Sequence, residues 1–226
     1  MVIQNLDDEQ LSEAVENCLT EEQLASLYLS TLWPDHDDAG MQAVLHSPKG
    51  TEKQKWFQQM ELQSLIQFLM KQSAVSDTRL SWCSFNWRKR SAGRVLELPG
   101  LFVDIDLAGS HHEQPDLPTM DEALQAVDSM PLPVSLLLHT GGGLLAVWLF
   151  DKPFKAGDNR QQAEKLLKNW EALLREVIGK HVDRAAKLTA VPRVPGTLNH
   201  KSGTTVMILK PELQTDSYSD GLEIMR

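Results

Sequence analysis

The heptapeptide LFVDIDL at residues 101–107 places two aspartates inside a run that otherwise favours burial. In a β-strand, alternate side chains point to the same face, so Asp104 and Asp106 project together and the aliphatic residues between them project from the other face. Burying unpaired carboxylates costs several kcal/mol. The strand must therefore bring these two groups to an edge of the core or to a positively charged partner.

Two readings of this DxD pattern stay open. Mg²⁺ or Mn²⁺ would relieve the repulsion by accepting oxygen ligands from both carboxylates, and the cation could then hold a triphosphate. Alternatively, the two side chains cap the loop that follows the strand. The motif is too short to decide between them.

The surrounding elements predict an α+β fold. From residue 95 the order is strand, helix, strand, strand, helix, strand, which is typical of a ferredoxin-like or RNA-recognition-type (RRM) antiparallel sheet unit. The expected strands cover 80–87, 94–98, 101–107, 134–139, 144–150 and 204–210; the expected helices cover 120–129, with a capping box from Thr119 to Glu122, and a stretch from Asp158 to about 178, ended by Gly179.

The region before this unit reads differently. Apolar residues recur at helical spacing over 8–31 and 52–72, with a loop and a short helix between them. We therefore expect two domains, a helical N-terminal region over 1–78 and the α+β core over 79–226. Residues 1–79 hold 13 acidic and 5 basic residues, whereas the rest holds 18 acidic and 17 basic ones, so most of the net charge of −9 belongs to the N-terminal region.

Composition narrows the class of protein. The two cysteines, Cys18 and Cys83, are far apart and form no zinc-binding spacing or disulfide framework. The N-terminus has no basic and apolar leader pattern, and no apolar run approaches the roughly 20 residues that span a bilayer. We expect a cytoplasmic protein with no membrane partner.

Two further stretches offer binding groups. The turn Thr140-Gly141-Gly142-Gly143 exposes backbone N–H groups that suit a phosphate or a base, although a plain hairpin tip has the same composition. In VPRVPGTLNHK, Pro192 and Pro195 stiffen a loop in which Arg193, Asn199, His200 and Lys201 offer donors for phosphate, sugar or base. A functional role is the favoured interpretation of this second stretch.

Together these stretches resemble the archaeo-eukaryotic primase (AEP) superfamily, in particular the primase-polymerase (PrimPol) domains of plasmids, phages and other mobile elements. LFVDIDL is similar to the first motif of the family, HTGGGLLAVWLF to the second, and VDRAAKLTAVPRVPGTLNHK to the third. SWCSFNWRKRSAGRVLELPG is similar to the strand that leads into the first motif. The likeness covers about residues 80–210 and leaves the N-terminal region unmatched.

The resemblance implies a nucleotidyltransferase that synthesises or extends DNA or RNA on a single-stranded DNA template. Asp104, Asp106 and Asp183 would be the catalytic carboxylates of a two-metal site for Mg²⁺ or Mn²⁺. Nucleoside triphosphates would bind Thr140, Gly141, Gly142, Gly143, Arg193, Asn199, His200 and Lys201; the DNA backbone would contact Arg88, Lys89 and Arg90; Trp82 and Trp87 are candidates for base stacking or core packing. No helicase motif is present, so a separate helicase or replication protein is an expected partner.

The family pattern is not followed everywhere. The second motif usually carries a histidine after the glycine turn, where this chain has Leu145, and Lys187 stands where many relatives have a second acid. One alternative is therefore a catalytically impaired module that binds nucleic acid or nucleotide. A metal-dependent nuclease, with His111, His112 or Glu113 activating water, is the third candidate.

Overall fold

A computed structural model describes residues 19–33, 40–110 and 114–210, and an eight-stranded antiparallel sheet runs through them. Its strands follow the order β10-β6-β7-β5-β4-β1-β2, with β3 paired to β1; β8 and β9 form a separate two-stranded ladder. The strands are β1 (Met41–His46), β2 (Lys53–Gln58), β3 (Thr78–Leu80), β4 (Ser84–Phe85), β5 (Val95–Asp106), β6 (Leu136–His139), β7 (Gly143–Lys155), β8 (Leu198–Asn199), β9 (Thr204–Thr205) and β10 (Met207–Lys210).

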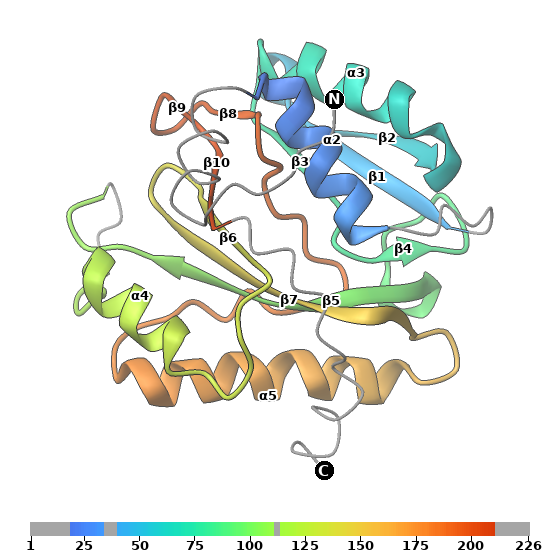
Figure 1. Cartoon of the computed structure of the whole chain (residues 1–226). Coiled ribbons are helices and arrows are strands. Elements are labelled where there is room, and N and C mark those ends of the chain that lie inside the picture. The colour runs from blue at the N-terminus through green and yellow to red at the C-terminus, as the bar shows by residue number, and fades with distance from the viewer. Residues whose placement is uncertain (1–18, 34–39, 111–113, 211–226) are drawn as a thin grey trace, which may run out of the picture.

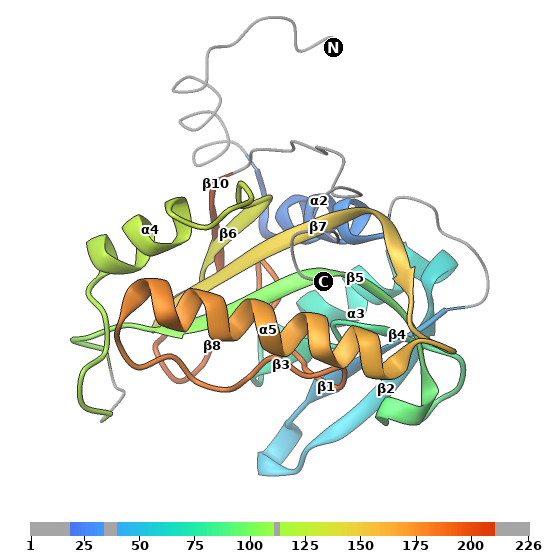
Figure 2. The same ribbon diagram turned by 90° about the horizontal axis from the view of Figure 1, so that it is seen from below.

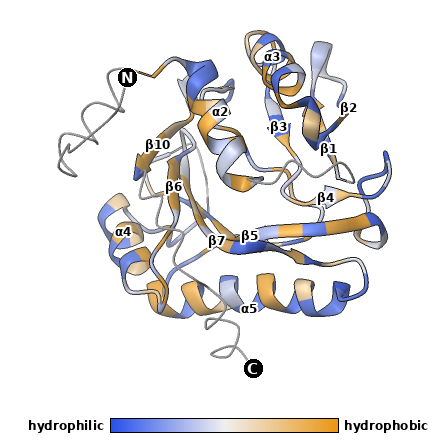
Figure 3. Cartoon of the chain, turned by 45° about the vertical axis from the view of Figure 1, so that its right-hand side comes forward, coloured by the Kyte–Doolittle hydropathy of each residue, from blue (hydrophilic) through white to orange (hydrophobic). Residues whose placement is uncertain are grey.

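Helices lie on both sides of this sheet. They are α2 (Glu21–Leu32), α3 (Leu62–Ser73), α4 (Met120–Asp128) and α5 (Arg160–Ile178). Helices α4 and α5 lie below β5, β6 and β7 in Figure 1, whereas α2 and α3 lie on the upper side near β1 and β2. Figure 2, viewed from below, shows α5 in front of the sheet that contains β5 and β7. Figure 3 shows β6 and most of β5 in hydrophobic colours between these helix layers, so these two strands lie in the core.

The two helices of the α+β unit form where the sequence predicts them. Helix α4 begins with the expected capping box, in which the Thr119 hydroxyl accepts from Glu122 N and the Glu122 carboxylate accepts from Thr119 N. Helix α5 buries Leu166, Leu167, Trp170 and Leu174 on one face. It ends at Gly179, whose φ of 62° is left-handed.

The predicted α+β class is confirmed, and so is the element order from β5 to α5. The strand expected at 80–87 is instead two short strands, β3 and β4, and the strand expected at 204–210 is divided into β9 and β10, which belong to different sheets. Strands β5 and β6 are joined through α4 and have β7 between them, which is the split βαβ arrangement of a ferredoxin-like unit. Strand β10 pairs with the outer side of β6, and β4 extends the sheet beyond β5. The two strands expected at 94–98 and 101–107 are one strand, β5, with an irregular register between Leu98 and Gly100.

The helical prediction for the N-terminal region is wrong over residues 41–58. Residues Met41–His46 and Lys53–Gln58 form an antiparallel hairpin, and α3 begins only at Leu62. Strand β2 is an edge strand that fully buries only Phe57, so it shows almost no alternation of apolar and polar residues. Strand β1 buries four consecutive residues, and a short continuous apolar run does not distinguish strand from helix.

The helix predicted over 8–31 is described only in part. Helix α2 starts with a capping box between Thr20 and Gln23, while residues 1–18 and 34–39 lie outside the described ranges. Strand β1 pairs with β3 and β4, so the sheet continues across residue 78. The division of the chain at this residue into two domains stays a prediction. None of the helices in the described ranges is long and apolar enough to cross a membrane.

Candidate active site

Asp104 and Asp106 stand at the end of β5, on one face of the sheet. Across the β5–β7 ladder, Asp104 lies opposite Leu145 and Asp106 lies opposite Gly143. Both aspartates are half-buried between fully buried neighbours. Burial, and after it the charge of Asp106, raise the pKa of Asp104 to about 6. The pair therefore carries the electrostatic cost that the sequence predicts.

Three other charged groups act on Asp104 from distant parts of the chain. Arg193 and Arg79 lower the pKa of Asp104, while Asp183 raises it. Asp183 follows α5 in a stretch without regular structure, and its Oδ1 lies 2.9 Å from His181 Nε2. The fold thus gathers two cationic and three acidic side chains around one strand end.

Asp104, Asp106 and Asp183 have the ligand chemistry that a divalent cation requires. They are hard oxygen donors, and the repulsion between Asp104 and Asp106 is the type of interaction that Mg²⁺ or Mn²⁺ relieves. The predicted third ligand is less closely placed. Among the described residues, no three acidic, histidine or cysteine side chains are grouped closely enough to hold an ion as they stand. Asp104 and Asp106 are therefore the assembled part of the proposed metal site, and Asp183 is in its electrostatic neighbourhood.

The glycine turn packs against the 193–201 loop. Gly141 has a φ of 94°, and an added Cβ there would collide with Ser202 Oγ and Thr204 Oγ1. An added Cβ on Gly143 would collide with the carbonyl oxygen of Ile105. Thr140 closes the turn by donating from its backbone N to Gly143 O at 2.9 Å. Packing therefore explains two of the three glycines without a phosphate.

Asn199 connects the turn to the loop. Its side chain is buried, donates from Nδ2 to Thr140 O at 2.7 Å, and accepts from Lys201 N at 3.1 Å. Predicted nucleotide-binding residues from two distant stretches are thus in contact. Lys201 itself is exposed.

The 193–201 loop is also docked onto residues at and just after the C-terminal end of α3. Asp77 accepts from Arg193 Nη2 at 3.2 Å and from His200 N at 2.9 Å. The Ser73 hydroxyl accepts from Leu198 N at 2.6 Å, and the His200 ring approaches Ser73 O at 2.7 Å. His200 is therefore engaged in docking the loop, in addition to any contact with a ligand.

The predicted DNA-binding cluster divides into two kinds of residue. Arg88 and Lys89 are exposed in the connection between β4 and β5, next to Trp87, which is 63% exposed. Arg90 donates to Thr189 O at 2.7 Å and lies 3.9 Å from Glu52, so it also holds the connection in place. Trp82 is fully buried and donates to Gly100 O, so it belongs to the core.

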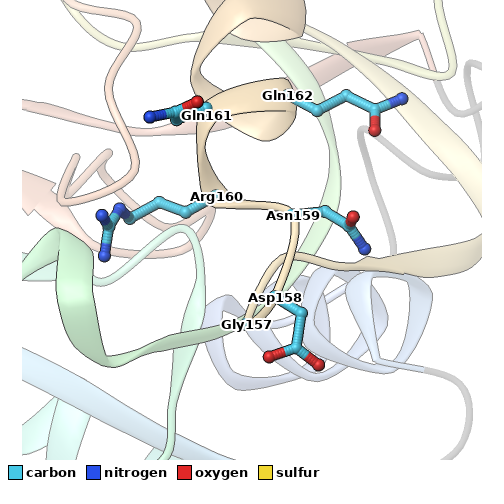
Figure 4. Close-up of a pocket in the computed structure, with 6 residues that line it drawn as sticks. All are labelled: Gly157, Asp158, Asn159, Arg160, Gln161 and Gln162. Carbon is cyan, nitrogen blue, oxygen red and sulfur yellow. The ribbon is translucent and has the colours of Figure 1, made fainter.

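A polar hollow of about 390 Å³ lies at the start of α5, lined by Gly157, Asp158, Asn159, Arg160, Gln161 and Gln162 (Figure 4). It lies near the beginning of β5, because Glu97 pairs with Lys155 in the β5–β7 ladder. Asp106 lies at the other end of that strand, roughly 30 Å from Glu97 at 3.3 Å per residue. The hollow is therefore separate from the carboxylate site.

Sequence reasoning missed Arg79, Asp77 and Ser73, which the fold brings to the candidate site. Arg79 is exposed between two buried residues of a three-residue strand, too short to attract notice. Asp77 and Ser73 lie more than a hundred residues before the loop they bind. Of the nuclease candidates, His111, His112 and Glu113 lie outside the described residues.

No family model matches the sequence. No curated protein matches it either. Solved structures do match. The AEP domain of the primase-polymerase of cyanophage S-2L is similar over 90% of this chain and 97% of its own, with 14% identity and a TM-score of 0.60. The fold is that of an AEP primase domain.

A second match is the catalytic domain of primase RepB′ in complex with initiator DNA, with 12% identity, a TM-score of 0.54, and coverage of 88% of this chain and 91% of that one. Another RepB′ structure matches 87% of this chain at 13% identity and a TM-score of 0.51. At such identities the likeness establishes the primase fold. It therefore confirms the fold that the motif resemblance implies.

Proposed function

We propose that this AEP-fold chain is a primase-polymerase-type nucleotidyltransferase that synthesises or extends strands on single-stranded DNA. The observation that carries the proposal is the convergence of Asp106, Asp183, Arg193 and Arg79 on the electrostatic environment of Asp104. This strand end suits a substrate that carries several phosphates. The carboxylates can bind phosphate through metal ions, and the arginines can bind phosphate directly. The fold of solved primase domains supports the same reading.

In this proposal Asp104 and Asp106 hold divalent cations, Mg²⁺ or Mn²⁺, with Asp183 as a third carboxylate. Two such cations would lower the pKa of the attacking 3′-hydroxyl and stabilise the charge of the pyrophosphate leaving group. Arg193 supplies a fixed guanidinium, oriented by Asp77 at 3.2 Å, on the nucleotide side. Asn199 keeps the Gly141 turn and the loop in contact, so that the two binding stretches stay in register.

Single-stranded DNA would follow the basic connection before β5. Arg88 and Lys89 are exposed for phosphate contacts, and Trp87 offers an exposed ring on which a base can stack. These side chains precede β5, whose 12 residues lead to Asp106. At 3.3 Å per residue the strand spans roughly 35 Å, a distance of several nucleotides. Processive synthesis would rely on a separate helicase or replication protein.

The test is extension of a labelled primer on single-stranded DNA with Mg²⁺ or Mn²⁺. We expect extension by the unmodified chain and its loss in Asp104→Ala/Asp106→Ala. Asp158→Ala removes an exposed acid between β7 and α5, near the start of β5 and away from the carboxylate site, and serves as the matched control, with extension unchanged. Extension that survives the double substitution would refute the carboxylate assignment.

A second candidate function is binding without synthesis. Leu145 lies directly opposite Asp104 on the same face of the sheet and is 1% exposed, so the position where relatives carry a histidine is apolar and closed here. DNA binding without extension, under conditions in which both nucleotides and metals are present, would favour this candidate. A gain of extension in Leu145→His would then locate the defect, because the imidazole would lie beside Asp104.

A further inference from the structure

The segment that leads into the 193–201 loop runs antiparallel to β3 and the residues that follow β3. Leu80 N donates to Pro192 O at 3.1 Å, and Trp82 N donates to Ala190 O at 3.0 Å. Two hydrogen bonds with this spacing define a register in which residue 80 faces 192 and residue 82 faces 190. Pro192 has no N–H, so the pairing is one-sided at this point.

The same register puts Arg79 directly opposite Arg193. In an antiparallel pairing, opposed residues project to the same face, and a pair next to a hydrogen-bonded pair has its side chains closest. Like charges in this position repel. Consistently, burial lowers the pKa of Arg193 and the charge of Arg79 lowers it further. The chain thus holds two cations side by side at a cost.

The described residues only partly compensate this charge. Arg193 Nη2 binds the Asp77 carboxylate, but its Nε is buried with no hydrogen-bond partner among the described residues. The Arg79 guanidinium is exposed and forms no hydrogen bond or ion pair with a side chain or backbone group in those ranges, whereas the Arg79 backbone pairs with Leu45 of β1. The ion pair with Asp77 therefore leaves guanidinium donors of both arginines for an anion.

This arginine pair lies beside the carboxylate site, because Asn199 of the same loop donates to Thr140 O at 2.7 Å and Gly143, at the end of that turn, lies opposite Asp106 in the β5–β7 ladder. An anion placed here meets guanidinium donors on one side and cations held by carboxylates on the other. A polyphosphate satisfies both, because some of its oxygens can bind metal while others accept hydrogen bonds from arginine. The side chain opposite Asp104, Leu145, offers no donor.

We propose that Arg79 binds the triphosphate of the incoming nucleotide together with Arg193, and that this arginine pair supplies the phosphate contact for which the glycine-turn strand has only Leu145. The inference rests on the proposed function for its substrate class. Its new element is Arg79, a residue outside the stretches that resemble family motifs. Arg79 is a specificity and binding residue in this scheme, since it contacts the substrate and not the reacting oxygen.

The test compares Arg79→Ala and Arg79→Lys with the unmodified chain. Binding of dATP and of inorganic tripolyphosphate is measured by calorimetry with Mg²⁺, and primer extension gives KM and kcat. We expect Arg79→Ala to weaken both ligands and raise the KM for dATP about 10- to 100-fold, as befits loss of a charged hydrogen bond, with kcat changed much less. Arg79→Lys should recover part of the loss. Arg160→Ala, an exposed cation at the start of α5, is the matched control.

Each outcome decides one question. If the unmodified chain extends primers but Arg79→Ala keeps the dATP affinity and KM, the role of Arg79 is refuted while the proposed function stands. If the chain binds dATP through Arg79 yet never extends a primer, the nucleotide site stands and the polymerase function fails. Loss of affinity for single-stranded DNA alone would assign Arg79 to the DNA backbone and overturn the inference. Thermal unfolding of each variant confirms that it is folded, and Arg79→Lys preserves the side-chain stem.

Discussion

Replacing Asp104 by asparagine should stabilise the metal-free protein. The pKa of this carboxyl is raised from 3.8 to about 6 by burial and by Asp106. This difference in pKa corresponds to about 3 kcal/mol of preference for the protonated form in the folded state. At neutral pH the ionised group costs the fold that amount, and Asp104→Asn removes the charge at nearly constant volume. For a chain of this size the gain corresponds to about 6 to 12 °C in Tm.

The raised pKa of Asp104 determines how the stability of the unmodified protein changes with pH. Below about pH 4 the carboxyl is protonated in both states, so its raised pKa has no effect on stability. Between pH 4 and 6 the unfolded chain releases the proton first, so the unmodified protein loses stability as pH rises, and above about pH 6 the loss is constant. Asp104→Asn escapes this loss.

The assay is urea unfolding in EDTA from pH 4.5 to 8, followed by circular dichroism. The difference between Asp104→Asn and the unmodified chain should grow up to about pH 6 and then level off. Asp158→Asn, which changes an exposed acid between β7 and α5, should change stability by less than about 0.5 kcal/mol at every pH. A variant less stable than the unmodified chain at pH 8, or a difference independent of pH, would refute the electrostatic reasoning.

Three other predictions concern the loop, the turn and the DNA path. Asn199→Ala should lower the free energy of unfolding by about 1 to 3 kcal/mol, because Thr140 O loses its buried donor, and chemical denaturation measures this. Gly141→Ala should cost at least about 1 kcal/mol in the same measurement, owing to its φ of 94° and the collision with Ser202, whereas Gly157→Ala, with open space around it, should cost less. Trp87→Ala should weaken single-stranded DNA binding by about 1 to 3 kcal/mol in fluorescence titrations, and an unchanged affinity would exclude base stacking there.

The core of the α+β unit could be predicted because its signals are local. The capping box at Thr119, the stop at Gly179 and the alternation around Asp104 each depend on a few neighbouring residues. The β1–β2 hairpin could not be predicted in this way. Neither strand shows the alternation of apolar and polar residues that marks a strand in a sequence, because β1 is buried on both faces and β2 buries little. The two strands are evident only from their pairing in the structure.

The site shows the same division between local and long-range information. Two motif residues can be recognised in the sequence. Asp104 is an acid within an apolar strand, and Arg193 is a cation in a loop stiffened by prolines. That Arg79 stands opposite Arg193, or that Leu145 stands opposite Asp104, depends on the register of backbone pairs formed between distant segments. Sequence reasoning therefore found the acids and the loop but not the second arginine.

The docking of the loop onto α3 also bears on when the site forms. The hydrogen bonds from Leu198 to Ser73 and from His200 to Asp77 join residues 125 and 123 positions apart. Closing such long loops is slow, and in a chain made from its N-terminus the second partner is synthesised more than a hundred residues after the first. We expect α3 and the β1–β2 hairpin to be structured before the nucleotide side exists. A nascent chain stalled before residue 193 would carry both DxD carboxylates without the loop and without Arg193.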